Sequence, residues 1–565
     1  MTIPTRMNLL QSGVEALRMA SKHRNRRLTA AGVLVFGLTG CTSRKPAPVP
    51  SLFDSGGPLP AVPAVRSPFT LEAINDPHTG KGAFSYRGHE LPPVMHAWPG
   101  QVLTLDYVNH MSAHSAEQCL HGLCMDMTNL HFHGLHVSPD APQDDAISMM
   151  AMPGQSLHYR VVIPLDQPPG LYWYHTHPHG ESYQQSLDGM SGAIVIDGID
   201  RYVPEVRMMK QRVLVLRDAE VGPEHPDTAS LEKLVQISHE RCSTVTEAPE
   251  RIFTVNGRTR PAIAIAPGEK QFWRIVNASP DLYADLSIDS EPLILIARDG
   301  MPIAFHDPAR RTETAQHILL PPAGRIEAIV TGPKAGIEAS LRTACVDTGA
   351  NGDANPAMVL ADLDTRMGAS SPTDPNVISQ KPAVYKPLPA AALQRYESRP
   401  PDYTVKFTED ARGFYINGRA YSPADGPMIT VSIGGYQHWH VSNDTHELHP
   451  FHIHQVHFLA YATNGNPETT PEWLDTVNVP VEGSVDLVMD FTDPIIRGMS
   501  LFHCHLLKHE DKGMMAKILF RQMPGEKEIF VGSGEREVRI RAPAVVRQQF
   551  PMTRVVAMSS AFFRK

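Results

Sequence analysis

A short segment near the carboxyl end of the chain combines cysteine, histidine and methionine at spacings that suit a metal. His503-Cys504-His505 is typical of a strand, so the two histidines share one face and Cys504 points to the other. His509 and Met514 follow Cys504 at intervals of five residues. A thiolate, imidazoles and a weak axial thioether form the ligand set of an electron-transferring copper site. That set needs one more histidine from elsewhere in the chain, and His503 and His505 need a second metal centre.

Pairs of histidines separated by one residue recur along the chain. With 28 His in 565 residues, chance predicts only about 1.4 such pairs. Six occur, at residues 131/133, 175/177, 177/179, 438/440, 452/454 and 503/505. On a strand, each pair places two imidazoles on one face. Residues 129–134, 172–177 and 449–454 therefore offer the imidazoles that the segment around Cys504 lacks.

These three stretches and residues 501–515 resemble the four copper-binding motifs of the multicopper oxidases, the family of laccases and bacterial copper-tolerance oxidases. The motifs occur in the family's order, and the resemblance spans roughly residues 80 to 522. It implies an all-β chain of three consecutive cupredoxin-like Greek-key β-sandwich or barrel domains.

The resemblance also implies a role for each motif residue. The type 1 (blue) site would be formed by His449, Cys504 and His509, with Met514 as axial ligand. His131 and His452 would hold a type 2 ion. A type 3 pair would be held by His133, His175, His177, His454, His503 and His505. Four coppers would store the four electrons that reduce O₂ to two waters, so O₂ and a small reducing substrate are the expected partners.

Oxygen reduction also consumes protons, which acidic residues near the cluster could relay. Glu510, next to His509, resembles the family's acid on the side where O₂ is reduced. Asp144, or its neighbour Asp145, follows the first motif where the family has another acid. The alternative for this acidic pair is a solvated loop.

Length and composition fit several β domains. At about 150 residues per domain, 565 residues predict three or four domains, and 50 Pro with 40 Gly favour short strands joined by turns. We expect domains at 70–205, 206–385 (without copper) and 402–522, followed by a tail at 523–565. Asn256-Gly257 and Asn417-Gly418 are turn dipeptides in similar contexts, which indicates duplicated domains.

Residues 1–41 are typical of an export signal. Residues 28–38 are apolar but too short to span a bilayer, and they end at Cys41 in a pattern that resembles a bacterial lipoprotein signal. The alternative is an ordinary secretory signal with a chance cysteine, and Arg26-Arg27 resembles a twin-arginine signal. We expect a Pro-rich tether at 42–69 and a monomer in the periplasm, touching a membrane only through Cys41. Thr42 after the anchor favours the outer membrane.

The remaining cysteines and several other residues have alternative interpretations. Cys119, Cys124, Cys242 and Cys345 could form two disulfides, and pairing 119 with 124 and 242 with 345 would keep each within a domain. Strand positions are the favoured interpretation for His438 and His440, and a place beside the site or at the surface for His179. Core packing is favoured over Cu(I) binding for Met149, Met150 and Met152.

The sequence therefore predicts an exported multicopper oxidase. Phenols and aromatic amines compete with Cu(I) or other low-valent metals as its reductant. A broad range of aromatic reductants, as in laccases, is favoured. We expect the segment from Gln455 to Asp475 to be a loop on the approach to His449, and it carries no dense Met or carboxylate cluster. A copper-free envelope scaffold would have broken motifs, whereas here every ligand position is filled. A net charge of -9 argues against nucleic acid as a partner.

Overall fold

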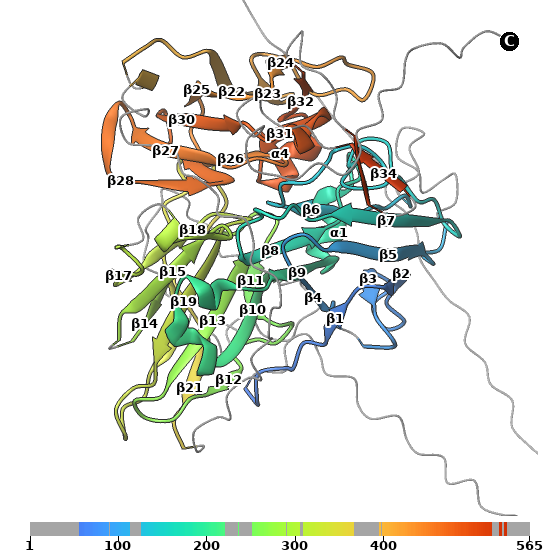
Figure 1. Ribbon diagram of the computed structural model, residues 1–565. Coiled ribbons are helices and arrows are strands. Elements are labelled where there is room, and N and C mark those ends of the chain that lie inside the picture. Colours follow the sequence, from blue (N-terminus) through green and yellow to red (C-terminus); the bar gives the residue numbers. More distant parts are fainter. Residues whose placement is uncertain are drawn as a thin grey trace, which may run out of the picture. The chain divides into compact units, whose positions relative to one another are not determined.

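The computed structural model describes residues 56–89, 91–113, 126–220, 236, 251–289, 291–305, 309–366, 395–396, 398–522, 530–533 and 536–539. Within them the chain is nearly all β-strand, and the strands form three successive pairs of sheets (Figure 1). The all-β, cupredoxin-like fold class is confirmed. No described helix is long and apolar enough to cross a membrane. The predicted signal at 1–41 lies outside the described residues.

The first pair of sheets carries two of the four histidine motifs. Alternate residues of its strands point inward to a core that contains Leu71, Leu105 and Phe132. One sheet has the order β1 (Ala64–Arg66), β4 (Val94–Ala97), β9 (Ser191–Ile196), β8 (Gly170–His175), β6 (His131–His133). The other has the order β3 (Gly82–Ser85), β2 (Phe69–Asn75), β5 (Val102–Asn109), β7 (Ser156–Val162).

The second pair of sheets carries no histidine motif and packs around a separate apolar core that includes Trp273 and Ile275. Its larger sheet has the order β11 (Arg251–Val255), β10 (Lys210–Glu220), β13 (Lys270–Asn277), β19 (Arg325–Thr331), β15 (Leu293–Arg298), β16 (Met301–Pro302), with β17 (Glu313–Ala315) paired to β15. The smaller sheet has the order β12 (Ala262–Ala264), β21 (Met358–Asp364), β20 (Ser340–Ala344), β14 (Ala284–Ile288), β18 (Ile318–Leu320).

The third pair of sheets carries the other two motifs, and its core includes Trp439, Cys504 and Met514. One sheet has the order β23 (Gly413–Ile416), β22 (Tyr403–Asp410), β25 (Gly435–Asn443), β30 (Ser484–Phe491), β27 (Phe458–Thr463), β28 (Asn466–Leu474). The other has the order β24 (Ile429–Ser432), β32 (Met515–Arg521), β31 (Gly498–Cys504), β26 (His449–Ile453), β29 (Thr476–Val479).

The three pairs repeat one local arrangement. In each, a strand pairs antiparallel with the next strand and parallel with the third strand after it: β2 with β3 and β5, β10 with β11 and β13, β22 with β23 and β25. After the second strand of each set (β3, β11 and β23), the chain turns at Arg87-Gly88, Asn256-Gly257 and Asn417-Gly418. The first residue of each turn has a φ of 51°. A positive φ at both central residues suits Asn-Gly, so the predicted turn at each of the two Asn-Gly sites is present.

Short helices and one hairpin complete the described elements: α1 (Ser182–Leu187), α4 (Leu507–Asp511), η2 (Ile199–Arg201), η3 (Pro204–Met208), η4 (Ile303–Phe305), η5 (Pro494–Ile496), and the pair β33 (Phe530–Ser533) and β34 (Arg536–Arg539). The predicted domain boundaries stay a prediction. In the range predicted as a tether, Pro58 bridges to Ala262 and β1 joins a sheet. Cys345 is in a disulfide, while Cys119, Cys124 and Cys242 lie outside the described residues.

Candidate metal centre

All four predicted motifs lie on neighbouring strands. β6 and β8 pair antiparallel with His131 opposite His175, and β26 and β31 pair antiparallel with His452 opposite His503. The two strand pairs face each other, since the His131 and His454 rings stack at 3.7 Å between centroids and the His133 and His452 rings at 3.8 Å. The first and third pairs of sheets thus bring their motifs into one place.

Eight imidazoles meet there, and all of them are buried. Their ring nitrogens converge closely enough for several groups of three to share an ion, such as His177, His454 and His503. In that group the His503 Nε2 atom lies 3.2 Å from His454 Nε2 and 3.4 Å from His177 Nε2. The eight are His131, His133, His175, His177, His452, His454, His503 and His505.

Hydrogen bonds at one ring nitrogen leave the other nitrogen of several rings free for a metal. Nδ1–H of His131 donates to Asp144, that of His175 to the Thr176 carbonyl and that of His452 to the Asp475 carbonyl. Within the described residues, Nε2 of the same three rings has no partner. In His133 the roles are reversed: Nε2–H donates to Asp475, and Nδ1 has no partner. This is how metal-ligating histidines are oriented in proteins.

Burial also lowers the pKa of seven of the eight rings and so keeps those seven neutral, as metal ligands must be. The loss of hydration lowers the pKa of His452 to about 3. It lowers the pKa of His133, His175, His177, His454, His503 and His505 well below the ordinary histidine value. Neutral imidazoles with partner-free lone pairs, gathered in a dry interior, fit copper ions.

A second, smaller group lies on the other side of Cys504, as the alternation along β31 predicts. The Cys504 sulfur lies 3.4 Å from His449 Nδ1, and His449 Nδ1 lies 3.4 Å from His509 Nδ1. Thr445 occupies the remaining nitrogen of His449, whose Nε2 lies 2.8 Å from the threonine hydroxyl. Cys504 is a free, buried thiol. One thiolate and two imidazoles are the main ligands of a blue copper site.

Backbone hydrogen bonds hold the loop that carries the rest of this group. The amide of Met514 donates to the His509 carbonyl at 2.9 Å, and the amide of Cys504 donates to the Met514 carbonyl at 3.0 Å. Helix α4 supplies the turn between Cys504 and His509. The Met514 side chain is buried in the same core as Cys504.

His509 is the outermost of the three ligands. Its Nε2 lies 3.5 Å from a Glu447 oxygen, and the ring of Phe414 stacks on it at 3.9 Å. His449 is fully buried. The expected loop between Gln455 and Asp475 is wrong, because residues 458–474 form the hairpin of β27 and β28.

The two predicted acids both contact the histidine cluster. Asp144 is buried and accepts from His131 Nδ1 at 3.0 Å, from the Phe132 amide and from Gln455, whereas Asp145 caps the amides of the exposed turn that follows. Of the acidic pair, only Asp144 therefore reaches the site.

Glu510 is buried against two ligands of the cluster. Its carboxylate oxygens lie 3.2 Å from His503 Nδ1 and 3.6 Å from His177 Nε2. The Ser182 side chain also hydrogen-bonds to this carboxyl group. Burial, with the nearby Asp511 carboxylate, raises the pKa of Glu510 well above its ordinary value.

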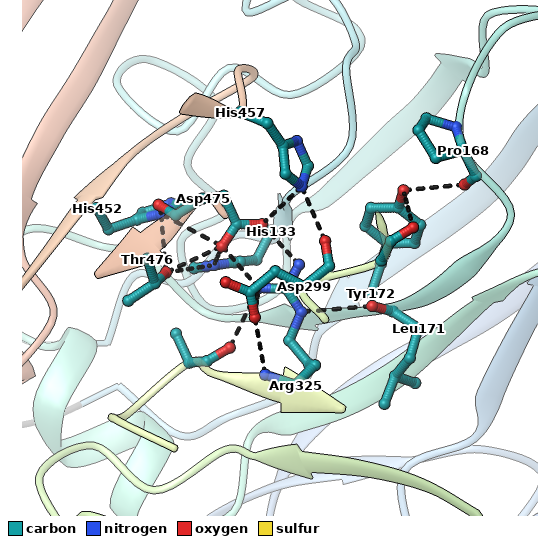
Figure 2. Close-up of polar contacts among 12 residues, drawn as sticks. His133, Pro168, Leu171, Tyr172, Asp299, Arg325, His452, His457, Asp475 and Thr476 are labelled. Carbon is teal, nitrogen blue, oxygen red and sulfur yellow. Dashed lines mark hydrogen bonds and ion pairs between the residues drawn. The ribbon is translucent and has the colours of Figure 1, made fainter. Parts of the chain in front are cut away.

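A buried ion pair that sequence reasoning missed supports the cluster from the second pair of sheets (Figure 2). Arg325, at the start of β19, donates to both Asp475 oxygens at 2.7 and 2.6 Å, and Asp475 accepts from His133 Nε2 at 3.2 Å. The guanidinium also donates to the carbonyl of Leu171 on β8. One arginine thus joins all three pairs of sheets, and it holds the pKa of Asp475 low although burial alone would raise it.

The glycine that ends the first motif explains how this pair fits. Gly134 has a φ of +85°, and a Cβ there would lie 2.4 Å from an Asp475 oxygen and 2.6 Å from an Arg325 nitrogen. Only glycine leaves room for the ion pair beside His133. Gly134 was the available sequence signal, although it does not identify the side chains that approach it.

The other singled-out residues lie outside the cluster. His179 packs against Tyr421, and His438 and His440 lie on β25, the strand positions favoured above. Met149 belongs to the first apolar core, whereas Met152 is 41% exposed.

Comparisons with known proteins agree with this geometry. Two family models described as multicopper oxidase match residues 72–200 and 394–523. The chain belongs to the multicopper oxidase family. Members of this family are oxidoreductases that use copper, so the chain is an oxidoreductase and copper is its implied cofactor.

Individual relatives are distant. A multicopper oxidase of Staphylococcus aureus is 22% identical over 451 residues, which cover 78% of this chain and 85% of that protein. A laccase of Bacillus subtilis is 24% identical over 407 residues, covering 62% of this chain and 71% of the relative. A solved multicopper oxidase of Campylobacter jejuni, described as a metallo-oxidase, has the same fold, with a TM-score of 0.61, 23% identity and coverage of 84% and 96%.

Substitution of Arg325 tests whether its ion pair with Asp475 stabilises the fold and orients the histidine cluster. We expect Arg325→Met to lower the free energy of unfolding by about 3–5 kcal/mol, because it leaves a buried carboxylate unpaired. Copper content should fall as well, since His133 and His452 both depend on Asp475. Chemical denaturation and metal analysis measure the two effects.

The matched control is Lys406→Met, which removes the exposed pair between Lys406 and Asp444, 2.7 Å apart. An exposed pair contributes only about 0–1 kcal/mol, so this variant should keep its stability and copper. Equal behaviour of the two variants would contradict the supporting role of Arg325.

Proposed function

We propose that this multicopper oxidase couples four one-electron oxidations of a small reductant to the reduction of O₂ to two waters. The observation that carries the proposal is the placement of two ligand sets on opposite sides of Cys504. One set is Cys504 with His449 and His509, and the other is the cluster of eight buried imidazoles.

These side chains would hold four copper ions, with Met514 joining Cys504, His449 and His509 at the type 1 ion. His131 and His452 would hold the type 2 ion. The type 3 pair would be held by His133, His175, His177, His454, His503 and His505. When bound, copper accepts single electrons at the cysteine site and supplies the four-electron reduction of O₂ at the histidine cluster.

The chain connects the two ligand sets by the shortest possible covalent route. His503 and His505 are the sequence neighbours of Cys504. In addition, Nδ1–H of His503 donates to the Cys504 carbonyl at 2.8 Å. This hydrogen bond fixes the His503 ring, and it adds a second link between the thiolate residue and the cluster.

Reduction of one O₂ consumes four protons, and two buried acids are placed to deliver them. Glu510 lies against His503 and His177, and the Ser182 side chain hydrogen-bonds to its carboxyl group. Asp144 contacts the other side of the cluster through His131 and is linked to Gln455. We assign proton transfer at the cluster to Glu510 and Asp144.

The reductant gives up its electrons at His509, the ligand nearest the surface. The stacked, partly exposed ring of Phe414 beside it supports a phenol or aromatic amine, which could pack against the same edge.

One observation favours a second candidate, Cu(I) or another low-valent metal ion. Glu447 lies 3.5 Å from His509 Nε2 and interacts with Glu409, a pair of acids suited to a cation.

A location in the bacterial envelope completes the proposal. The sequence around Cys41 supports export, lipid attachment and outer-membrane anchoring in the periplasm, and the disulfide at Cys345 supports an oxidising compartment. Mass spectrometry of the protein from bacterial membranes should find an acylated Cys41 as the first residue. A mature chain that begins elsewhere would contradict the lipid anchor.

Oxygen uptake by the copper-loaded, signal-free protein tests the activity. We expect uptake with a phenol, slower uptake with Cu(I) after subtraction of its spontaneous oxidation, and no enzymatic uptake by Cys504→Ser. Faster turnover with Cu(I) would favour the metal-oxidising candidate. Absence of uptake with either reductant, despite full copper, would overturn the oxidase proposal and favour a scaffold.

The role of Glu510 can be separated from electron entry. Glu510→Gln should slow O₂ reduction by about 100-fold or more, because a positioned proton donor contributes about that factor. Anaerobic reduction of the blue site, followed by its absorbance, should be unchanged. The control is Glu482→Gln at an exposed position. Equal slowing of both steps, or of neither, would contradict proton delivery by Glu510.

A further inference from the structure

A histidine pair that the copper chemistry does not use lies on the six-stranded sheet of the third pair. His438 and His440 alternate with Trp439 on β25, and Trp439 packs into the core that contains Cys504. The two histidines therefore face the opposite side of the sheet. On the neighbouring strand β30, Asp486 is directly paired with His440.

Two imidazole nitrogens meet one carboxylate oxygen at this place. The Oδ1 atom of Asp486 lies 2.8 Å from His440 Nδ1 and 3.3 Å from His438 Nε2. Ligands of a tetrahedral metal at about 2.0–2.1 Å lie about 3.3 Å from one another. The 3.3 Å contact matches this spacing, and the 2.8 Å contact would lengthen by about 0.5 Å if both side chains bound one small cation.

A fourth donor comes from an irregular strand. The pairing of β27 with β30 shifts register between Ala460 and Ala462, so Tyr461 is the extra residue of a β-bulge. Its hydroxyl lies 2.8 Å from His438 Nε2. A bulge redirects a side chain that regular pairing would place elsewhere, and bulges are enriched next to binding sites.

The hydrogen bond at the other ring nitrogen of His438 shows which nitrogen carries the proton. Nδ1–H of His438 donates to the carbonyl of Arg399 at 3.0 Å. In the neutral ring Nε2 then carries a lone pair, which accepts from the Tyr461 hydroxyl at 2.8 Å and could bind a metal ion in place of that hydrogen bond. Metal-bound histidines are oriented by just such a bond to a backbone carbonyl.

We propose that His438, His440 and Asp486 bind a divalent transition-metal ion of the zinc type, apart from the copper centre. Imidazole and carboxylate ligands suit zinc, and the Tyr461 hydroxyl or a water completes four positions. The side chains of His440 and Asp486 are 33% and 16% exposed, so the ion can enter from solvent.

The ion would fasten the segment that leads into the third pair of sheets. The His438 amide donates to Asp402, the Asp402 amide donates to the His438 carbonyl, and Arg399 accepts from the His438 ring. Residues 399–402 thus rest on the same histidine that binds the ion. Metal binding at this place should stabilise the folded chain.

Zinc titration of the copper-loaded, signal-free protein tests the proposal, because copper already fills the histidine cluster. Calorimetry and metal analysis should show one Zn²⁺ per chain that His440→Gln and Asp486→Asn each lose. Affinity should fall by more than the roughly 10–100-fold that loss of an outer partner costs. Zinc should raise the thermal midpoint of the parent protein and of neither variant.

The matched control is His317→Gln, which removes an exposed His–Asp contact of 2.9 Å that involves only one imidazole. It should bind zinc as the parent does. Unchanged blue absorbance shows that each variant is folded and copper-loaded. Absence of the extra zinc ion, or its retention in both site variants, would overturn the proposal and leave a hydrogen-bonded triad with a protonated imidazole.

Discussion

The structure depends on eight imidazoles that are gathered in a buried interior. Several of these rings have one nitrogen without a hydrogen-bond partner among the described residues. Each buried polar atom left without a hydrogen bond costs about 1–3 kcal/mol. Within the described residues, partner-free nitrogens occur in His131, His133, His175, His452 and His505. These partner-free nitrogens lower the stability of the fold, so stability alone does not explain their presence in a buried interior. Bound metal offsets this cost, so folding of the centre and copper binding are parts of one equilibrium.

This constraint gives each pair of sheets a separate task. The first and third pairs supply the imidazoles, and neither holds a complete cluster alone. The second pair supplies Arg325, whose charge keeps Asp475 ionised and so fixes His133 and His452. The middle of the chain therefore orients the ligands, although it carries none of them.

The convergence of the candidate ligands could be predicted from sequence because their spacing is local. An alternating strand fixes which face each member of a His-x-His pair occupies, whatever surrounds it. The choice between Asp144 and Asp145 could not be made in this way, since only the packed structure shows which carboxylate reaches His131. Arg325 and Asp475 are 150 residues apart, and neither belongs to a spacing pattern. Gly134 marked a close approach there without identifying its neighbours.

The most direct test of the central claim is anomalous diffraction at the copper edge from crystals of the copper-loaded protein. The account predicts one copper beside Cys504, His449 and His509, and further copper among the eight histidines between the first and third pairs of sheets. Copper beside Cys504 with none among those histidines would contradict it, because their partner-free nitrogens would then have no metal to bind.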